Sequence, residues 1–175
     1  RPLYTLTSAV DDIELGIDHV IRGEDHVANT AVQIQLFQAL GGKVPVFAHL
    51  PLLVDASGGA LSKRIGSLAL EGLRADGIEP MAVNSLLAHL GTADPVEPFR
   101  HLDDLVASFD LKRFGRAAPH FDARELEHVN AKLLHVTPHA EVKDRLAALR
   151  LADAGEGFWL AVRGNIQRLS DVKDW

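Results

Sequence analysis

The segment of residues 58–67 is the part of the sequence best suited to chemistry on phosphate groups. It reads Gly-Gly-Ala-Leu-Ser-Lys-Arg-Ile-Gly-Ser, so a basic pair is flanked by glycines that permit unusual backbone angles. Lys63 carries a compact positive charge on a long side chain, as a phosphate-binding loop requires. The alternative is an ordinary solvated loop with two surface cations, and residues 58–67 alone do not decide between the two.

A second candidate site centres on an arginine that follows a short predicted strand at residues 17–21. Four ionisable residues fall within positions 22–26, and ligands of open α/β sheets collect at the carboxyl ends of strands. Arg22 offers a planar fork that binds a carboxylate through two hydrogen bonds, and we expect the hydroxyl of Tyr4 to reach the same ligand from a neighbouring strand. The alternative is a polar loop whose side chains only cap the next helix.

Composition excludes several other kinds of site. The chain has no cysteine, which rules out disulfides and thiol catalysis and fits a cytoplasmic location. His128 and His135 lie seven positions apart, roughly 10 Å along a helix, so they are too distant to share one ion and we expect no metal site. No apolar run approaches the roughly 20 residues that span a membrane, so we expect no membrane association.

Hydrophobic periodicity predicts an α/β part followed by an all-α part. The first part is expected to run strand, strand, helix, strand and basic loop, an order typical of the back part of a nucleotide-binding domain. Beyond residue 66 the pattern is helical throughout, and Asp122 and Thr137 are expected to cap two of the helices. The predicted strands are residues 3–13, 17–21 and 45–54, and the predicted helices include residues 28–40, 68–75, 80–90, 122–134 and 158–169.

Length and charge narrow the class of protein further. A chain of 175 residues holds one ordinary domain or two small ones. Its net charge of −6 argues against indiscriminate nucleic-acid binding, although it leaves room for a local basic face. The sequence starts at Arg1 rather than at a methionine and stops at Trp175 within a predicted amphipathic helix, so we expect an excised fragment.

Several motifs in a fixed order resemble those of bacterial glutamyl-tRNA synthetases, a family of class I aminoacyl-tRNA synthetases. The resemblance extends over nearly the whole chain. The motifs are Pro-x-Tyr at residues 2–4, Val10-Asp11-Asp12, His19-Val-Ile-Arg-Gly-Glu-Asp-His26, Asn29-Thr30, Ala48-His-Leu-Pro-Leu-Leu53, Leu61-Ser-Lys-Arg64, Phe121-Asp122 and Val129-Asn130.

The resemblance implies three regions and one activity. Residues 1–67 would be the C-terminal half of a Rossmann-type catalytic domain with a KMSKS-like loop, residues 68–136 a helical stem-contact region, and residues 137–175 the start of a helical anticodon-binding domain. The parent protein would activate glutamate with ATP, accompanied by Mg²⁺, to glutamyl-adenylate and then transfer the glutamyl group to tRNA(Glu). We expect the parent to be a monomer and the fragment by itself to be inactive.

The resemblance also assigns site residues. It implies that Tyr4, Ser8, Arg22 and His26 contact glutamate, and that Lys63 and Arg64 contact ATP. Arg22 would pair with the side-chain carboxylate of glutamate. Lys63 would be the catalytic residue, because it would neutralise the ATP phosphates while pyrophosphate leaves.

Two departures from the family pattern keep other functions open. Ala60 stands where the family usually has lysine, and Ser8 stands where it often has asparagine. The HIGH signature of the class lies outside the chain. One alternative is the shortened paralogue that glutamylates a queuosine base, which the long helical tail disfavours because that enzyme lacks an anticodon-binding domain. The other is a noncatalytic module that binds tRNA or protein, which Ala60 favours.

Overall fold

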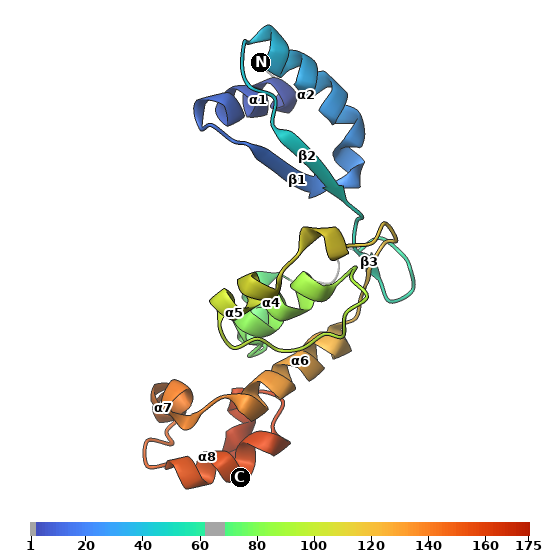
Figure 1. Cartoon of the computed structure of the whole chain (residues 1–175). Coiled ribbons are helices and arrows are strands. Elements are labelled where there is room, and N and C mark those ends of the chain that lie inside the picture. The colour runs from blue at the N-terminus through green and yellow to red at the C-terminus, as the bar shows by residue number, and fades with distance from the viewer. Residues whose placement is uncertain (1–2, 62–68) are drawn as a thin grey trace. The chain divides into compact units, whose positions relative to one another are not determined.

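The computed structural model describes residues 3–61 and 69–175, which divide into two compact units (Figure 1). Unit 1 contains residues 1–53 and 116–119, and unit 2 contains residues 54–115 and 120–175. Unit 1 is α/β, and unit 2 is mainly helical. The expected change from α/β to helical structure along the chain is therefore present.

Unit 1 is built on a parallel pair of strands, β1 (His19–Gly23) and β2 (Val46–Leu50). Parallel strands need a crossover connection, and here a short 3₁₀ turn, η1 (Glu24–His26), and helix α2 (Val27–Ala39) supply it. Helix α1 (Tyr4–Glu14) packs against α2, and Ala9 and Phe37 are fully buried in this unit. Figure 1 shows the two helices and the strand pair at the blue end of the chain.

Helix α1 corrects the prediction of a strand at residues 3–13. The β-branched residues of this segment favoured a strand, but the apolar positions Leu6, Ala9 and Ile13 also have helical spacing. Packing of that face against α2 outweighs the weak intrinsic preference of the residues. The hydroxyls of Thr7 and Ser8 donate to carbonyls three residues earlier, so they are compatible with the helix.

The other strand predictions hold with shifted limits. The strand expected at residues 17–21 is β1, two residues further along, and the helix expected at residues 28–40 is α2. The strand expected at residues 45–54 is divided into β2 and the short β3 (Val54–Asp55). The division falls at Pro51, which has no N–H to donate to a neighbouring strand.

Unit 2 is a set of short helices joined by tight turns, with a small parallel strand pair between β3 and β4 (His120–Phe121). Its α-helices are α3 (Leu70–Ala75), α4 (Pro80–His89), α5 (Leu102–Ser108), α6 (Ala123–Val136), α7 (His139–Ala148) and α8 (Glu156–Val162). Its 3₁₀ turns include η3 (Leu111–Arg113), η4 (Arg163–Asn165) and η5 (Leu169–Asp174).

The predicted cap of α6 is present in the structure, and the predicted cap of α7 is not. Asp122 caps α6, because its carboxylate accepts the N–H of Arg124 at 2.9 Å. Thr137 does not cap α7, whose N-cap is Pro138. Instead the Thr137 hydroxyl donates to the Leu133 carbonyl at 2.7 Å, because a buried hydroxyl at the end of α6 has that carbonyl four residues back as its nearest acceptor.

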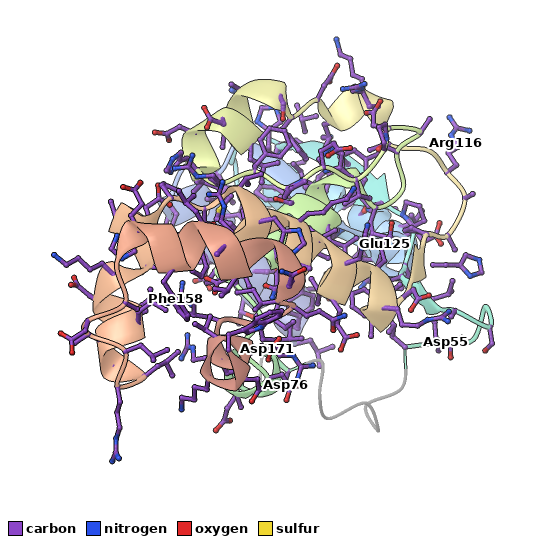
Figure 2. All side chains as sticks on the ribbon, turned by 90° about the horizontal axis from the view of Figure 1, so that it is seen from below. Asp55, Asp76, Arg116, Glu125, Phe158 and Asp171 are labelled. Carbon is purple, nitrogen blue, oxygen red and sulfur yellow. The ribbon has the colours of Figure 1, made fainter. Side chains whose placement is uncertain are left out.

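The predicted helix at residues 158–169 is also shorter than expected. Helix α8 ends at Val162, and the chain passes through η4 to an extended residue, Ile166, which is buried. Gly164 within η4 disfavours continuation of an α-helix. After the extended stretch, the carboxylate of Asp171, labelled in Figure 2, accepts the N–H groups of residues 167 and 168 and so begins η5.

Helix α6 contributes to both hydrophobic clusters of unit 2. Figure 1 shows it running between α4 and α5 on one side and α7 and α8 on the other. The first cluster consists of Ile78, Ala82, Leu86, Leu126, Val129 and Leu133. The second consists of Leu134, Val142, Leu146, Trp159, Val162, Ile166, Leu169 and Val172. Leu126, Val129 and Leu133 of α6 belong to the first cluster and Leu134 belongs to the second, so adjacent sides of one helix contact both clusters.

Asn130 is the polar residue that joins the segments around α6. Its side chain is fully buried, its Oδ1 accepts the N–H of Glu79 at 2.7 Å, and its Nδ2 donates to the carbonyl of Gln167 at 2.7 Å. These partners lie 51 and 37 positions away in the sequence. One amide side chain therefore satisfies two backbone groups from distant parts of unit 2.

Replacing Asn130 by leucine should destabilise unit 2 by about 2–6 kcal/mol, because it leaves two part-buried backbone groups unpaired and each costs about 1–3 kcal/mol. Urea unfolding followed by tryptophan fluorescence measures the change, since Trp159 is fully buried in the same unit. The exposed Asn84→Leu change on α4 is the matched control and should alter the unfolding midpoint little. Equal midpoints for both variants would contradict the bridging role of Asn130.

Candidate active site

Arg22 lies near the carboxyl end of β1 and is half-buried. Its Nη2 donates to the hydroxyl of Thr30 at 2.7 Å and reaches the carbonyl of His26 at 3.4 Å. Its guanidinium carbon lies 5.2 Å from the centre of the Phe47 ring, within the range of a cation–π interaction. The sheet supports this arrangement because residues 20 and 47 are paired, so Arg22 and Phe47 project from the same face.

The Nε atom of Arg22 is buried and has no hydrogen-bond partner among the described residues. A charged donor without an acceptor is unfavourable in a protein interior. The strand end thus carries a positive group whose hydrogen-bonding capacity the surrounding chain satisfies only partly. An anion such as a carboxylate is the ligand that suits such a group.

Thr30 and His49 belong to this site although the sequence did not single them out as site residues. The Thr30 oxygen lies 3.0 Å from Nε2 of His49 and 3.3 Å from the carbonyl of His26. Thr30 is in the first turn of α2, and His49 is paired with Arg22 in the strand register. The signal that could have found them is their position, because the expected crossover helix returns its first turn to the end of β1.

Tyr4 and His26 lie together at one side of the site. Their ring centres are 6.1 Å apart and tilted, and Tyr4 is 58% exposed. Tyr4 begins α1, so it approaches from a helix and not from the neighbouring strand that we expected. His26 is held by the side chain of Asn29 at 3.1 Å, and the carboxylate of Asp25 lies 3.7 Å from its other ring nitrogen.

Ser8 occupies a contact between α1 and α2. Its hydroxyl donates to the carbonyl of Thr5 at 3.3 Å and accepts from Nε2 of Gln33 at 2.9 Å. Gln33 is only 1% exposed, and its Oε1 has no partner in the part of the chain that the structure describes. The Ser8 hydroxyl is therefore engaged with the helix packing, and Gln33 is a buried polar residue that the sequence did not reveal.

Lys63 and Arg64 lie outside the described residues, but the turn that leads toward them is well defined. One carboxylate oxygen of Asp55 accepts the N–H groups of Ser57 and Gly59, each at 2.9 Å, and the hydroxyl of Ser57 at 2.6 Å. Gly58 has a φ of +84°, which glycine adopts without strain. Figure 2 shows Asp55 at this turn, which closes a bridge between Val54 and Ala60.

The hydrogen bonds of this turn affect the acidity of Asp55. The Ser57 hydroxyl, followed by the N–H groups of Gly59 and Ser57, holds the pKa of the Asp55 carboxyl below its usual value. These donors stabilise the ionised form. The turn is therefore best formed when Asp55 is charged.

The described residues contain neither a metal-binding cluster nor a membrane-spanning helix. Within residues 3–61 and 69–175, no three histidine or acidic side chains gather as a metal site would need. No helix in those same residues has both the length and the apolar character needed to cross a bilayer.

Comparison with known proteins places the chain in a family. The sequence model described as "tRNA synthetases class I (E and Q), catalytic domain" matches residues 1–128. The chain therefore belongs to the class I tRNA synthetases of this group. Two curated relatives carry the name glutamate–tRNA ligase. The one from Azospirillum brasilense is 58% identical over 176 residues, and glutamate–tRNA ligase 1 of Maricaulis maris is 53% identical over 174 residues.

The chain matches only part of each relative. The alignments cover 100% and 99% of this chain but 39% of each of those two ligases. A solved structure of a glutamate tRNA ligase from Elizabethkingia meningosepticum, in complex with its amino acid, superposes with a TM-score of 0.81. It is 24% identical and covers 99% of this chain and 40% of that one, so it supports the fold.

Replacing Asp55 by alanine should lower the melting temperature at pH 7, and the difference from the unaltered protein should shrink on acidification. The pKa of Asp55 is lower in the folded protein than its unfolded value of about 3.9, so its stabilising effect is complete well above that value. The effect is lost as the pH falls through the folded pKa. Thermal unfolding between pH 3 and pH 7 measures it.

The control for this experiment is Asp153→Ala, which removes an exposed carboxylate from another turn of unit 2. Its melting temperature should follow that of the unaltered protein across the same pH range. A difference for Asp55→Ala that stays constant from pH 7 to pH 3 would show that the charge on Asp55 does not support the turn.

Proposed function

We propose that this chain is part of a glutamate–tRNA ligase, which forms glutamyl-adenylate from glutamate and ATP and transfers the glutamyl group to tRNA(Glu). The observation that carries the proposal is the Arg22 guanidinium, which is presented at the end of β1 with a buried Nε that lacks an acceptor among the described residues. Membership of the family and the names of the 53–58% identical relatives support it.

In this proposal the glutamate pocket is formed by unit 1. Arg22 pairs with the side-chain carboxylate of glutamate through charge-assisted hydrogen bonds. Tyr4 and His26, whose ring centres are 6.1 Å apart, line the pocket, and Arg22 reaches the carbonyl of His26. Ser8 contributes a hydroxyl that Gln33 already holds, so its contact with glutamate would be weaker than that of the more usual asparagine.

ATP binding is assigned to the segment that follows the Asp55 turn. One oxygen of the glutamate α-carboxylate attacks the α-phosphorus of ATP, a P–O bond forms, and the bond to the bridging oxygen breaks as pyrophosphate leaves. Lys63 stabilises the negative charge on the phosphates, and Arg64 assists it. Mg²⁺ accompanies ATP as part of the substrate, bound by its phosphate oxygens.

The three regions expected from the sequence are retained as part of the proposal. Residues 1–67 belong to the catalytic domain, residues 68–136 to the stem-contact region, and residues 137–175 to the start of the anticodon-binding domain. The family match through residue 128 supports a catalytic assignment for the first part, and the helical character of unit 2 supports the other two. We expect the parent ligase to act as a monomer in the cytoplasm.

Exchanging Arg22 for lysine in the full-length protein should raise the KM for glutamate about 10- to 100-fold, because lysine keeps the charge but loses the planar fork. Hydrogen bonds to charged groups contribute about 1.5–3 kcal/mol, which corresponds to that range. ATP–pyrophosphate exchange at varied glutamate measures the change. The exposed Arg124→Lys substitution is the control, and an unchanged KM for glutamate in Arg22→Lys would refute the assignment of Arg22.

The 175-residue chain by itself should show no ATP–pyrophosphate exchange, whereas the full-length protein should be active. The reason is that the chain spans 39% of the length of its ligase relatives, so groups supplied by the remainder are missing from the reaction. The two proteins are compared at equal molar concentration with glutamate and ATP present. Exchange by the isolated chain at the full-length rate would overturn this expectation.

A further inference from the structure

We infer that Thr30 is the positioning residue that orients Arg22 toward its carboxylate ligand, with His49 holding the Thr30 hydroxyl in place. This inference rests on the proposed function, since it concerns how the same site recognises glutamate. Among the described residues, the Thr30 oxygen is the atom that links three groups of the site. It lies 2.7 Å from Arg22 Nη2, 3.0 Å from His49 Nε2 and 3.3 Å from the His26 carbonyl.

The number of hydrogens at Thr30 limits how these contacts are made. A hydroxyl has one hydrogen to donate and two lone pairs to accept with. The guanidinium of Arg22 contains only donor groups, so it must donate to the Thr30 oxygen. The single hydroxyl hydrogen then goes either to the His26 carbonyl or to His49. When it goes to the His26 carbonyl, an N–H on Nε2 of His49 fills the second lone pair, and every group around the oxygen is satisfied.

The backbone holds the Thr30 oxygen in a defined direction. In a helix, threonine has few allowed side-chain rotamers, and one of them places the hydroxyl against the carbonyl four residues earlier. Thr30 makes that contact with His26 at the start of α2. The remaining lone-pair direction is then turned toward the end of β1, where Arg22 lies. The geometry of the helix thus directs the Thr30 oxygen toward Arg22.

His49 reaches the same oxygen because of the strand register. Arg22 and His49 are paired across the parallel strands, so their side chains leave the sheet on the same face. Thr30, on the helix that covers this face, lies between them and contacts both. Loss of its hydroxyl would remove one hydrogen-bond partner from Arg22 and one from His49 at the same time.

The consequence for Arg22 is a restricted guanidinium. One of its nitrogens is bonded to Thr30, and one face of the group lies over the ring of Phe47. With both constraints present, the plane of the fork has a fixed direction. Without the Thr30 bond the group can turn over the ring, and a carboxylate then meets a mobile donor in place of an oriented one. Ordering a mobile donor costs free energy when the ligand binds, so the loss should fall on the KM for glutamate.

Thr30→Val tests the inference in the full-length protein because valine has the shape of threonine without its hydroxyl. We expect the KM for glutamate to rise about tenfold or more while kcat and the KM for ATP change less than about twofold. Thr30→Ser restores a hydroxyl and should bring the KM for glutamate back to within about threefold of the unaltered value. The matched control is Thr92→Val, which removes a similar hydroxyl from unit 2 and should leave all three constants unchanged.

A measurement on the 175-residue chain separates positioning from simple stabilisation. The side-chain nitrogen signals of Arg22 and His49 are recorded by ¹⁵N NMR, together with the melting temperature. Thr30→Val should shift the His49 Nε2 signal and broaden or average the Arg22 guanidinium signals, whereas Thr30→Ser should leave both near their original positions. Unchanged signals in Thr30→Val would overturn the inference. So would a rise in the KM for ATP and a fall in kcat as large as the rise in the KM for glutamate.

The outcomes also separate this inference from the proposed function. If Arg22→Lys raises the KM for glutamate but Thr30→Val does not, Arg22 binds the carboxylate without help from Thr30, and only the inference fails. If Arg22→Lys has no effect on glutamate, the proposed function loses the observation that carries it, whatever Thr30→Val does to the NMR signals.

Discussion

The parallel pairing of β1 with β2 determines the surroundings of Arg22. The register opposes Arg22 to His49 and residue 20 to Phe47, and the alternation of side chains along each strand brings these groups to the same face. The crossover that parallel pairing requires returns α2 over that face and delivers Thr30. A slip of the register by one residue would send Phe47 and His49 to the opposite face and leave Arg22 without either neighbour.

Unit 2 depends on a different constraint, which is that α6 packs into two hydrophobic clusters. Its apolar residues divide between two clusters, and Asn130 on the same helix bonds to backbone groups from two distant segments. Hydrophobic contact alone is not directional, so it would tolerate several arrangements of short helices around α6. The paired hydrogen bonds of Asn130 are directional, and they favour the arrangement in which residues 79 and 167 both meet its side chain.

The sequence predicted the parts of this structure that depend on the spacing of apolar residues and on residues that begin or end helices. Helix α2, the start of α4 at Pro80 and the cap at Asp122 follow from spacing, proline and an acceptor side chain. The prediction was wrong where packing determines the secondary structure, as in α1, whose β-branched residues suggested a strand. In the site, Arg22 was identifiable from its chemistry. Thr30 and His49 were missed, because their contacts depend on the strand register and on where the crossover helix begins, which become apparent only once the elements are placed together.

The residues that form the site come from separate positions along the chain. Arg22 and Thr30 are 8 positions apart and Thr30 and His49 are 19 apart, and their contacts require the finished β–α–β crossover. The full set of contacts therefore needs β1, α2 and β2 together. A carboxylate ligand that binds the folded form alone must therefore raise the folding constant of unit 1 by a factor of one plus the ratio of the free ligand concentration to Kd. Ligand binding and the folding of this unit are thereby thermodynamically linked.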